Sequence, residues 1–212
     1  MKALLSTTYF GPVQWYQKLY RHDEVQVEQW ESFLKQTYRN RCLIATTQGI
    51  QVLTVPVERG TSQRIKDIRI SDHGNWRHLH WNALMSAYGE SPFFEYYQDD
   101  IRPFFEKRWD YLFDFNEAIR EKMCELLDIQ PKVSLSLEFR QSWGQAPEAE
   151  PSEPVPMTVD FRETIRPKHP LPDPDFAPKP YYQVYQQKHG FLPNLSILDL
   201  LFNMGPESVF YL

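Results

Sequence analysis

The segment Thr37-Tyr38-Arg39-Asn40-Arg41 places two arginines around an amide, directly before two short apolar runs. Arginine is rarely buried without a partner, so this composition is a poor one for a core. It suits an anion, because a guanidinium binds carboxylate or phosphate through two hydrogen bonds while asparagine both donates and accepts. The segment predicts an anion-binding pocket around Arg39, Asn40 and Arg41, with a solvated strand start as the alternative.

A second candidate is the histidine pair His78 and His80 on one predicted helix. Two residues apart on a helix, their side chains point in different directions and cannot share a metal ion. His80 follows Trp76 by one turn, and histidine titrates near neutral pH, as a general base should. The alternative is a structural histidine hydrogen-bonded to a neighbouring loop. No metal site is predicted.

Asp199 lies in the most apolar predicted helix, one turn before Asn203. Burying a carboxylate alone would cost several kcal/mol, so we expect it to meet Arg39, Arg41 or the backbone of the opening loop. The contact is either a structural ion pair that holds the C-terminal helix to the sheet, or a wall of the site.

Aromatic residues gather after the first predicted strand, at Tyr9, Phe10, Trp15 and Tyr16. Ligands of open α/β sheets bind near such turns, and aromatic faces suit a sugar ring or a nucleobase. They suit a hydrophobic core equally well. Cys42 offers a nucleophile for a hydrolase, although most buried cysteines are inert.

The pattern of apolar residues predicts an α/β fold: a mixed β-sheet flanked by helices, with a Pro-rich extended segment and a C-terminal docking helix. Strands at 3–7 and 24–29 joined by a helix from residue 13 to residue 20 form a β-α-β unit, which predicts a parallel pair. Further strands are expected at 43–45 and 52–57 as an antiparallel hairpin, at 65–70, and at 133–139.

Helices are predicted from Asn75 as N-cap, from Ser91-Pro92 with an interruption at Pro103, and over 114–127. Between Ala146 and Pro180 lie ten of the 17 prolines in 35 residues, so regular structure is not expected there. We interpret 145–180 as a loop or an extended strap within one domain.

Composition narrows the class of protein. A net charge of −5 argues against broad nucleic-acid binding, and no apolar run approaches the length of a membrane span. No secretory signal is evident, and two cysteines without metal spacing suit a reducing compartment, so we expect a cytoplasmic protein. Gly-x-Gly-x-x-Gly, P-loop and nucleophile-elbow motifs are absent, so no cofactor is predicted.

Several blocks together resemble the WbqC-like family of bacterial proteins. They are Gln36 to Arg41, Gly49, Leu53 to Val57, Trp76 with His80, Ser91 to Phe94, and Leu192 to Asn203. The chain departs from the family at its opening, where Thr7-Thr8 stand in place of a common Gln-Pro. The resemblance spans nearly the whole chain and implies a single WbqC-like domain over 1–212.

The resemblance also implies a context. The family is found among O-antigen and surface-polysaccharide genes, and some members are suggested to transfer glycine to a sugar amine or hydroxyl. On this hypothesis His80, Asn40 and Asp199 would be catalytic: His80 as base, Asn40 as oxyanion donor and Asp199 as the orienting group. Six residues would bind substrate: Tyr9, Tyr38, Arg39, Arg41, Trp76 and Asn203.

The expected partners are a sugar or nucleotide-sugar and an anionic donor, and oligomeric state is left open. The alternative is a non-catalytic sugar or nucleotide-sugar binding protein that scaffolds the same pathway. Whether the pocket is an enzyme site is therefore left open by the residues.

Overall fold

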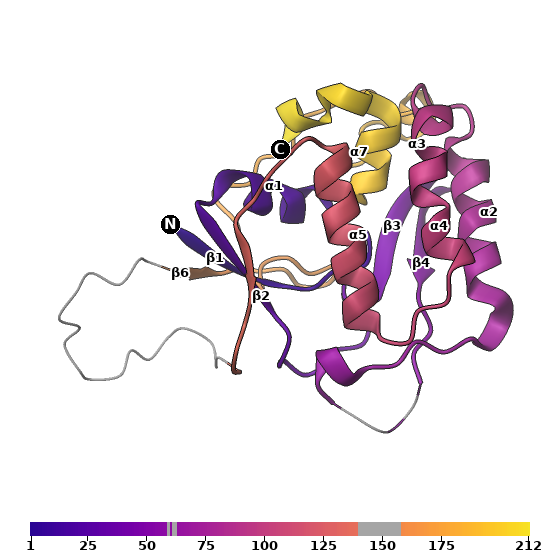
Figure 1. The fold of residues 1–212 in the computed structure, drawn as a ribbon. Helices are drawn as coiled ribbons and strands as arrows, with labels where there is room; N and C mark the ends of the chain where they lie inside the picture. The colour runs from indigo at the N-terminus through magenta and orange to yellow at the C-terminus, as the bar shows by residue number, and fades with distance from the viewer. Residues whose placement is uncertain (59, 61–62, 140–157) are drawn as a thin grey trace.

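The computed structural model describes residues 1–58, 60, 63–139 and 158–212. At its centre is a four-stranded sheet in the order β5-β2-β1-β6, in which each neighbouring pair is parallel (Figure 1). Its strands are β1 (Lys2–Ser6), β2 (Glu24–Glu28), β5 (Val133–Leu135) and β6 (Thr158–Asp160).

The first parallel pair forms as the sequence predicts. Helix α1 (Val13–Arg21) connects β1 to β2, and the register runs from Lys2 opposite Glu24 to Ser6 opposite Glu28. The apolar centre of β1 is fully buried, as in parallel sheets covered on both faces. Because these residues hold β1 in the core, Ser6 lies at the carboxyl end of the strand.

The predicted hairpin is also confirmed. Strands β3 (Arg41–Thr46) and β4 (Gly49–Thr54) pair antiparallel across a turn whose Gly49 has φ 103°, a value that favours glycine. They form a sheet of their own, so the parallel and antiparallel strands of this α/β fold belong to two sheets.

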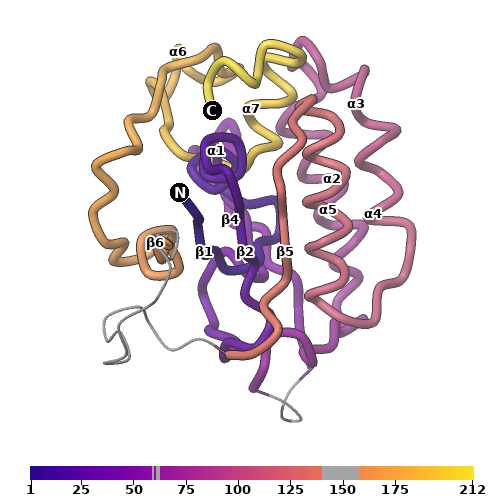
Figure 2. Tube along the Cα trace, turned by 60° about the vertical axis from the view of Figure 1, so that its left-hand side comes forward, coloured from indigo at the N-terminus to yellow at the C-terminus, as the bar shows by residue number. Residues whose placement is uncertain are grey.

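Helices cover the hairpin and the remaining side of the molecule (Figures 1 and 2). They are α2 (Trp76–Tyr88), α3 (Phe94–Ile101), α4 (Pro103–Glu106), α5 (Leu112–Leu126), α6 (Gln186–His189) and α7 (Ile197–Met204). Helix α7 docks as predicted: it contacts α1, α3 and β3, and its residues from Ile197 to Asn203 are buried. Pro103 begins α4, in keeping with the predicted interruption.

The predicted strand over 65–70 is wrong. Ile65–Asp67 forms a 3-10 turn, and only single bridges follow, Val57 with Ile70 and Arg69 with Tyr111. The turn forms because the Ile65 amide donates to the Glu31 carbonyl at 2.9 Å, which anchors the segment across the loop after β2. The alternating isoleucines reach the core from this irregular path.

Two predictions about the later chain need correction. Strand β5 ends at Leu135, short of the predicted Phe139, because its partner β2 ends at Glu28. The Pro-rich segment contains the strand β6, although no regular structure was predicted there. The prolines on both sides of β6 are the reason that the sequence did not indicate it. The part of the predicted loop at 145–157 lies outside the described residues.

Beyond β6 the chain runs beside α1 as an extended strap (Figure 2). Asp173 of the strap pairs with Lys18 of α1 at 2.8 Å, and both side chains are buried. The Gln14 side chain donates to the same carboxyl at 2.8 Å. A buried ion pair therefore ties the strap to the first helix.

Candidate functional site

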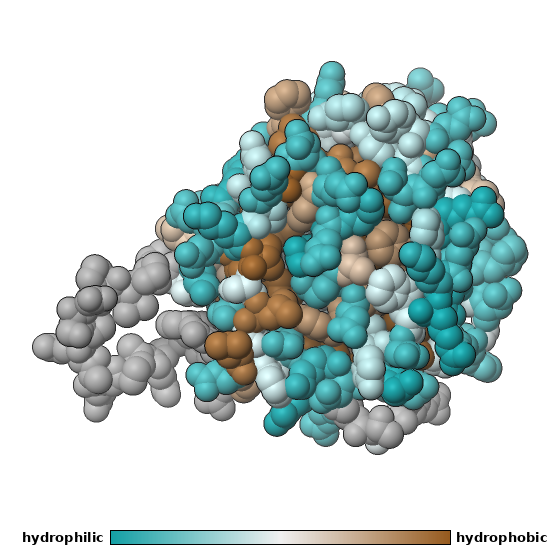
Figure 3. Space-filling view, viewed as in Figure 1, coloured by the Kyte–Doolittle hydropathy of each residue, from teal (hydrophilic) through white to brown (hydrophobic). Residues whose placement is uncertain are grey.

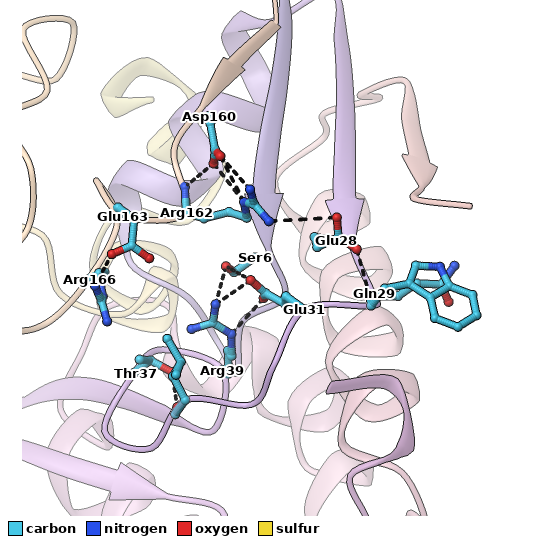
Figure 4. Close-up of polar contacts among 12 residues, drawn as sticks. Ser6, Glu28, Gln29, Glu31, Thr37, Arg39, Asp160, Arg162, Glu163 and Arg166 are labelled. Atoms are coloured by element: carbon cyan, nitrogen blue, oxygen red, sulfur yellow. Dashed lines mark hydrogen bonds and ion pairs between the residues drawn. The ribbon is translucent and has the colours of Figure 1, made fainter. Parts of the chain in front are cut away.

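Polar side chains stand where the strands of the parallel sheet end. Ser6 closes β1, Glu28 closes β2, Asp160 closes β6, and Ser136 follows β5 by one residue. Because the strands are parallel, all four residues lie at the same end of the sheet, and Figure 4 shows Ser6, Glu28 and Asp160 there. The Ser136 hydroxyl contacts Glu28 at 2.6 Å. In chain order the sheet reads 3-2-1-4, so its connections change direction between β1 and β6. Open α/β sheets bind ligands at that position.

Arg39 reaches this edge from the loop before β3. Its Nε and Nη2 atoms donate to the two carboxylate oxygens of Glu31 at 2.8 and 2.6 Å, and Nη2 also donates to the Ser6 hydroxyl at 2.9 Å (Figure 4). Arg39 is 3% exposed and Glu31 5%. This is a bidentate, charge-assisted pair of the strong kind.

The backbone around Arg39 is held from two sides. The Tyr38 carbonyl accepts from the Tyr9 amide at 2.9 Å, and the Arg39 carbonyl accepts from the Asn116 side chain at 2.8 Å. The loop after β1 and helix α5 thus fix the guanidinium relative to the sheet.

A second arginine stands opposite the first. Arg162 donates through Nη2 to Asp160 at 2.7 Å, and its Nη1 lies 4.0 Å from Glu28 Oε2. The other oxygen of Glu28 accepts from the Trp30 amide at 2.8 Å and from the Ser136 hydroxyl at 2.6 Å. Glu28 is fully buried, and its Oε2 has no hydrogen-bond partner among the described residues.

All of these charged side chains except that of Glu28, which is fully buried, line an open cleft. The cleft has a volume of about 330 Å³ and is lined by both arginines, Asp160, Glu31, Glu163 and Phe139 among others. Beneath it a hollow of about 10 Å³ between β1, the Arg39 loop and Arg162 has room for about one water molecule. With three carboxylates and two guanidiniums, the cluster is complementary to a ligand that carries both an amine and an anionic group.

Helix α1 offers no phosphate site of the dinucleotide-binding kind. Its first backbone amides are occupied: Val13 donates to the Leu195 carbonyl at 3.0 Å and Gln14 to the Asn194 side chain at 2.9 Å. The segment before α7 therefore caps the helix terminus that phosphates otherwise occupy. Among the described residues no cluster of acidic, histidine and cysteine side chains is arranged for a metal ion.

His80 lies away from this cleft, in an aromatic environment. Its Nδ1 accepts from the Tyr9 hydroxyl at 2.8 Å, the Thr54 carbonyl accepts from the ring, and the Trp76 ring centroid is 5.1 Å away. Burial disfavours the imidazolium and lowers the pKa of His80 to about 4. At neutral pH the ring is therefore an uncharged member of the core, beside Tyr9 and Trp76.

Asn40 and its neighbours have mixed roles. The Asn40 amide donates to the Val55 carbonyl at 2.8 Å, which ties the start of β3 to the end of β4. Tyr38 is buried, and loss of solvation raises its pKa to about 12. Arg41 opens β3 in a half-buried position, and its Nε has no hydrogen-bond partner in the described part of the chain.

Asp199 is surrounded by uncharged donors. Its carboxylate accepts from the Tyr88 hydroxyl at 2.9 Å, the Tyr181 hydroxyl at 2.7 Å and the Gln183 side chain at 2.9 Å, while Asn203 donates to its carbonyl at 2.7 Å. Burial raises the pKa of Asp199 to about 6, against the lowering effect of its three donors. The expected contact with Arg39 or Arg41 is not made; Arg39 has Glu31 instead.

The structure thus distributes the predicted residues over three places. Arg39 stands at the sheet edge, Tyr9, His80 and Trp76 share one buried cluster, and Asp199 and Asn203 share another. Sequence reasoning missed four residues of the charged cluster: Glu28, Glu31, Asp160 and Arg162. Glu28 carried a usable signal, because it is an acidic residue at the end of an alternating strand.

Fold and site together define an α/β protein with an open parallel sheet and a charged cleft at the carboxyl ends of its strands. The chain belongs to the WbqC-like protein family, whose profile matches residues 7–149 and 174–211. Glu28, Glu31 and Arg39 fall inside the matched ranges, whereas Asp160 and Arg162 fall between them.

A curated relative covers most of the chain. It is the uncharacterized protein Rv1507c of Mycobacterium tuberculosis, 29% identical over 217 residues, which are 96% of this chain and 91% of that protein. No solved structure gives a significant match. No helix among the described residues is both long and apolar enough to cross a membrane.

Proposed function

We propose that the chain is an acyl transferase of bacterial surface-polysaccharide (O-antigen) biosynthesis, which moves a glycyl group onto a sugar amine or hydroxyl at the carboxyl edge of the parallel sheet. The observation that carries the proposal is the charged cluster beside the cleft. Arg39 and Arg162 supply positive charge, and Glu28 retains a buried carboxylate oxygen with no hydrogen-bond partner. Family membership supports the pathway.

The arginines and the carboxylates of the cluster have separate roles in this proposal. The guanidiniums of Arg39 and Arg162 attract an anionic group of the donor or of the nucleotide-sugar. Their carboxylate partners keep both arginines oriented and leave a net negative charge that favours an amine. The ligand must therefore carry both an amine and an anionic group. These groups replace protein partners in the ion pairs that are already present.

The chemical step is an ordinary acyl transfer. The acceptor nitrogen or oxygen attacks the carbonyl carbon of an activated glycyl ester, thioester or acyl phosphate. A bond from the acceptor to carbon forms, the bond to the leaving group breaks, and the acceptor's proton passes to a carboxylate, for which Glu28 is the candidate. Glu28 does not line the cleft, so the proton reaches it when Arg162, 4.0 Å away, turns toward the ligand. The leaving group departs with the electron pair of the broken bond and then takes up a proton.

In this proposal the base is an acidic residue and not His80. His80 already accepts from Tyr9, is enclosed by aromatic rings and does not line the cleft, so it does not reach a proton on the acceptor there. Asn40 and Asp199 likewise have partners inside the protein, which hold the hairpin and the strap. We assign these three residues to the scaffold.

The alternative is a non-catalytic sugar or nucleotide-sugar binding protein of the same pathway. One observation favours it: Arg39 is already satisfied by a bidentate contact with Glu31, as in a structural ion pair. Such a protein would bind ligand in the cleft without a base. Turnover therefore discriminates between the two functions, and binding alone does not.

The test is a transfer assay with purified chain, glycyl-tRNA, a glycyl thioester or glycyl phosphate as donor, and a UDP-linked amino sugar as acceptor. The product is identified by the mass increase of one glycyl residue. Glu28→Gln keeps the shape of the side chain and should lower turnover by about 10²-fold or more, the usual contribution of a general base. Glu117→Gln, at a half-buried carboxyl of α5 that pairs with Arg120, is the control and should retain turnover.

Equal turnover by the wild type and Glu28→Gln would contradict the role of Glu28. If no donor is used, yet the amino-sugar nucleotide binds to the wild type, the scaffold function is supported instead. Binding is measured by titration calorimetry on the same preparations.

A further inference from the structure

A second cleft lies between α2 and α4, on the side of the molecule away from β6 (Figure 1). Its volume is about 300 Å³. Trp81 and Phe105 line it as apolar side chains, and Arg77, His78 and Arg102 line it as basic ones. The surface over α2 and α4 is largely hydrophilic (Figure 3). Asp72 and Glu106 line it too, each paired with an arginine, so the cleft combines aromatic rings with a rim of paired charges.

Arg77 is the least satisfied of the side chains that line this cleft. Its Nη1 donates to Asp72 at 2.7 Å, and its guanidinium lies 4.7 Å from the Trp76 ring centroid. Its Nε and Nη2 atoms are buried and have no hydrogen-bond partner among the described residues. Nε and Nη2 form one edge of a guanidinium. Arg39 uses the same edge of its own guanidinium to bind the Glu31 carboxylate.

An unfilled bidentate edge is costly in a shielded position. A buried donor left without a partner loses its hydration and gains nothing in return. Elsewhere in the protein the same edge is used for a carboxylate, so the chemistry that would satisfy Arg77 is a planar or tetrahedral anion. The edge is buried, so an anion reaches it when the Arg77 side chain rotates within the cleft that it lines.

The charges around Arg77 point to the same kind of ligand. Asp72 is bound by Arg77 and by Arg108, and the hydrogen bond from Arg77 holds the pKa of Asp72 below its usual value. Glu106 is paired with Arg102 at 2.6 Å. Two arginines and two carboxylates line the cleft, and Arg108 from outside it gives Asp72 a second partner, so Arg77 shares its only carboxylate.

The start of α2 also favours an anion. Its first turn contains Arg77 and His78 and no acidic residue, and Asn75 takes the N-cap position with φ 47° and no side-chain cap. Basic side chains in a first turn oppose the helix dipole, which an anion at the same place would relieve. The rings of Trp81 and Phe105 would contact the body of the ligand beside the anion.

We propose that the α2–α4 cleft binds a small organic phosphate, a phosphate group carried on a sugar or nucleoside ring. Arg77 takes the phosphate on its Nε–Nη2 edge, His78 and Arg102 stand at the rim, and the ring lies against Trp81 and Phe105. The site is separate from the charged cleft of the parallel sheet and does not depend on the transferase proposal. Glucose 1-phosphate and UMP represent the two kinds of ring.

The test is a calorimetric titration of the full chain with glucose 1-phosphate, UMP and inorganic phosphate. Arg77→Lys keeps the charge and removes the bidentate edge, so the affinity for the preferred organic phosphate should fall about tenfold. Arg69→Gln is the matched control, because Arg69 also lies over a ring, that of Tyr111, and also pairs with acidic residues, but does not line the cleft. Its affinity should equal that of the wild type.

His78→Gln removes an exposed imidazole, whose Nε2 is hydrogen-bonded to the Asn82 side chain at 2.8 Å, and should weaken binding by a smaller factor. The proposal is overturned if none of the three phosphates binds at millimolar concentration, or if Arg77→Lys and His78→Gln both bind like the wild type. Equal affinity for inorganic phosphate and both organic ligands would overturn the role of the aromatic rings. Glu28→Gln should leave this binding intact, which separates its failure from failure of the transferase proposal.

Discussion

Two of the regions in which this protein buries ionisable side chains satisfy them by different means. At the carboxyl edge of the parallel sheet, Arg39 and Arg162 meet carboxylates directly, beside an open cleft. Between the helices and the hairpin, His80 and Asp199 meet only uncharged groups and are enclosed. Paired charges beside an opening can be exchanged for those of a ligand, whereas an enclosed neutral network has nothing to exchange. The first region is therefore the better candidate for binding.

The largest expected effect comes from separating the charges at the sheet edge. Arg39→Met removes the guanidinium and leaves the Glu31 carboxylate buried, which should destabilise the fold by about 3–5 kcal/mol. Urea unfolding measures the loss. The double variant with Glu31→Leu removes both charges and should recover most of it. A loss below about 1 kcal/mol in the single variant would show that the pair is solvated, as surface pairs are.

The enclosed region should respond to pH in two opposite ways. Burial holds the pKa of Asp199 near 6, above its ordinary 3.8, so the folded state binds the extra proton and stability falls as pH rises through this interval. Burial holds the pKa of His80 near 4, below its ordinary 6.5, so stability is lost as pH falls through this interval. Each pKa shift changes the free energy of unfolding by about 3 kcal/mol across its pH interval, and the two changes have opposite sign in the wild type.

Single substitutions should separate these two contributions. Asp199→Asn leaves His80, so the stability of this variant should rise more steeply with pH between about 4 and 6 than that of the wild type. His80→Gln leaves Asp199 and should shift the slope in the opposite direction. Urea unfolding at several pH values measures both. Parallel curves for the three proteins would contradict the assigned pKa directions.

A smaller effect is expected from a single neutral hydrogen bond of the enclosed region. Tyr9→Phe removes the hydroxyl that His80 Nδ1 accepts from, at a cost of about 1–2 kcal/mol. Tyr20→Phe, at an exposed tyrosine of α1, should change stability by no more than about 0.5 kcal/mol. Equal unfolding midpoints for these two variants would show that the Tyr9–His80 contact contributes nothing to stability.

The sequence predicted the scaffold of the site better than its chemistry. The β1-α1-β2 unit was evident because buried parallel strands are continuous apolar runs and α1 has helical spacing. Arg39 was identified as polar and anion-binding, but its partner Glu31 comes from an irregular loop whose path no local pattern shows. Asp160 and Arg162 were hidden in a Pro-rich segment, where β6 exists only because β1 offers an edge.

The enclosed residues show the same limit of prediction from sequence. Asp199 was correctly expected to need partners, but burial next to Tyr88 and Tyr181 depends on how α7 docks onto α2 and the strap. His80 and Asn40 have types that suit catalysis, and only the three-dimensional contacts reveal that both are occupied. The type of a residue shows which chemistry its side chain could perform. Its access to a cleft decides whether a ligand can use that chemistry.

The most direct test of the comparison is a titration of the protein with glycine, followed by amide chemical shifts. Glycine carries both an amine and a carboxylate, as the charged cleft requires. We expect the largest shifts in Ser6 to Thr8, Glu28 to Glu31 and Phe161 to Arg162, with little change around His80 and Asp199. Shifts centred on Tyr9, His80 and Asp199, or none at all, would contradict the assignment of the ligand site to the carboxyl edge of the sheet.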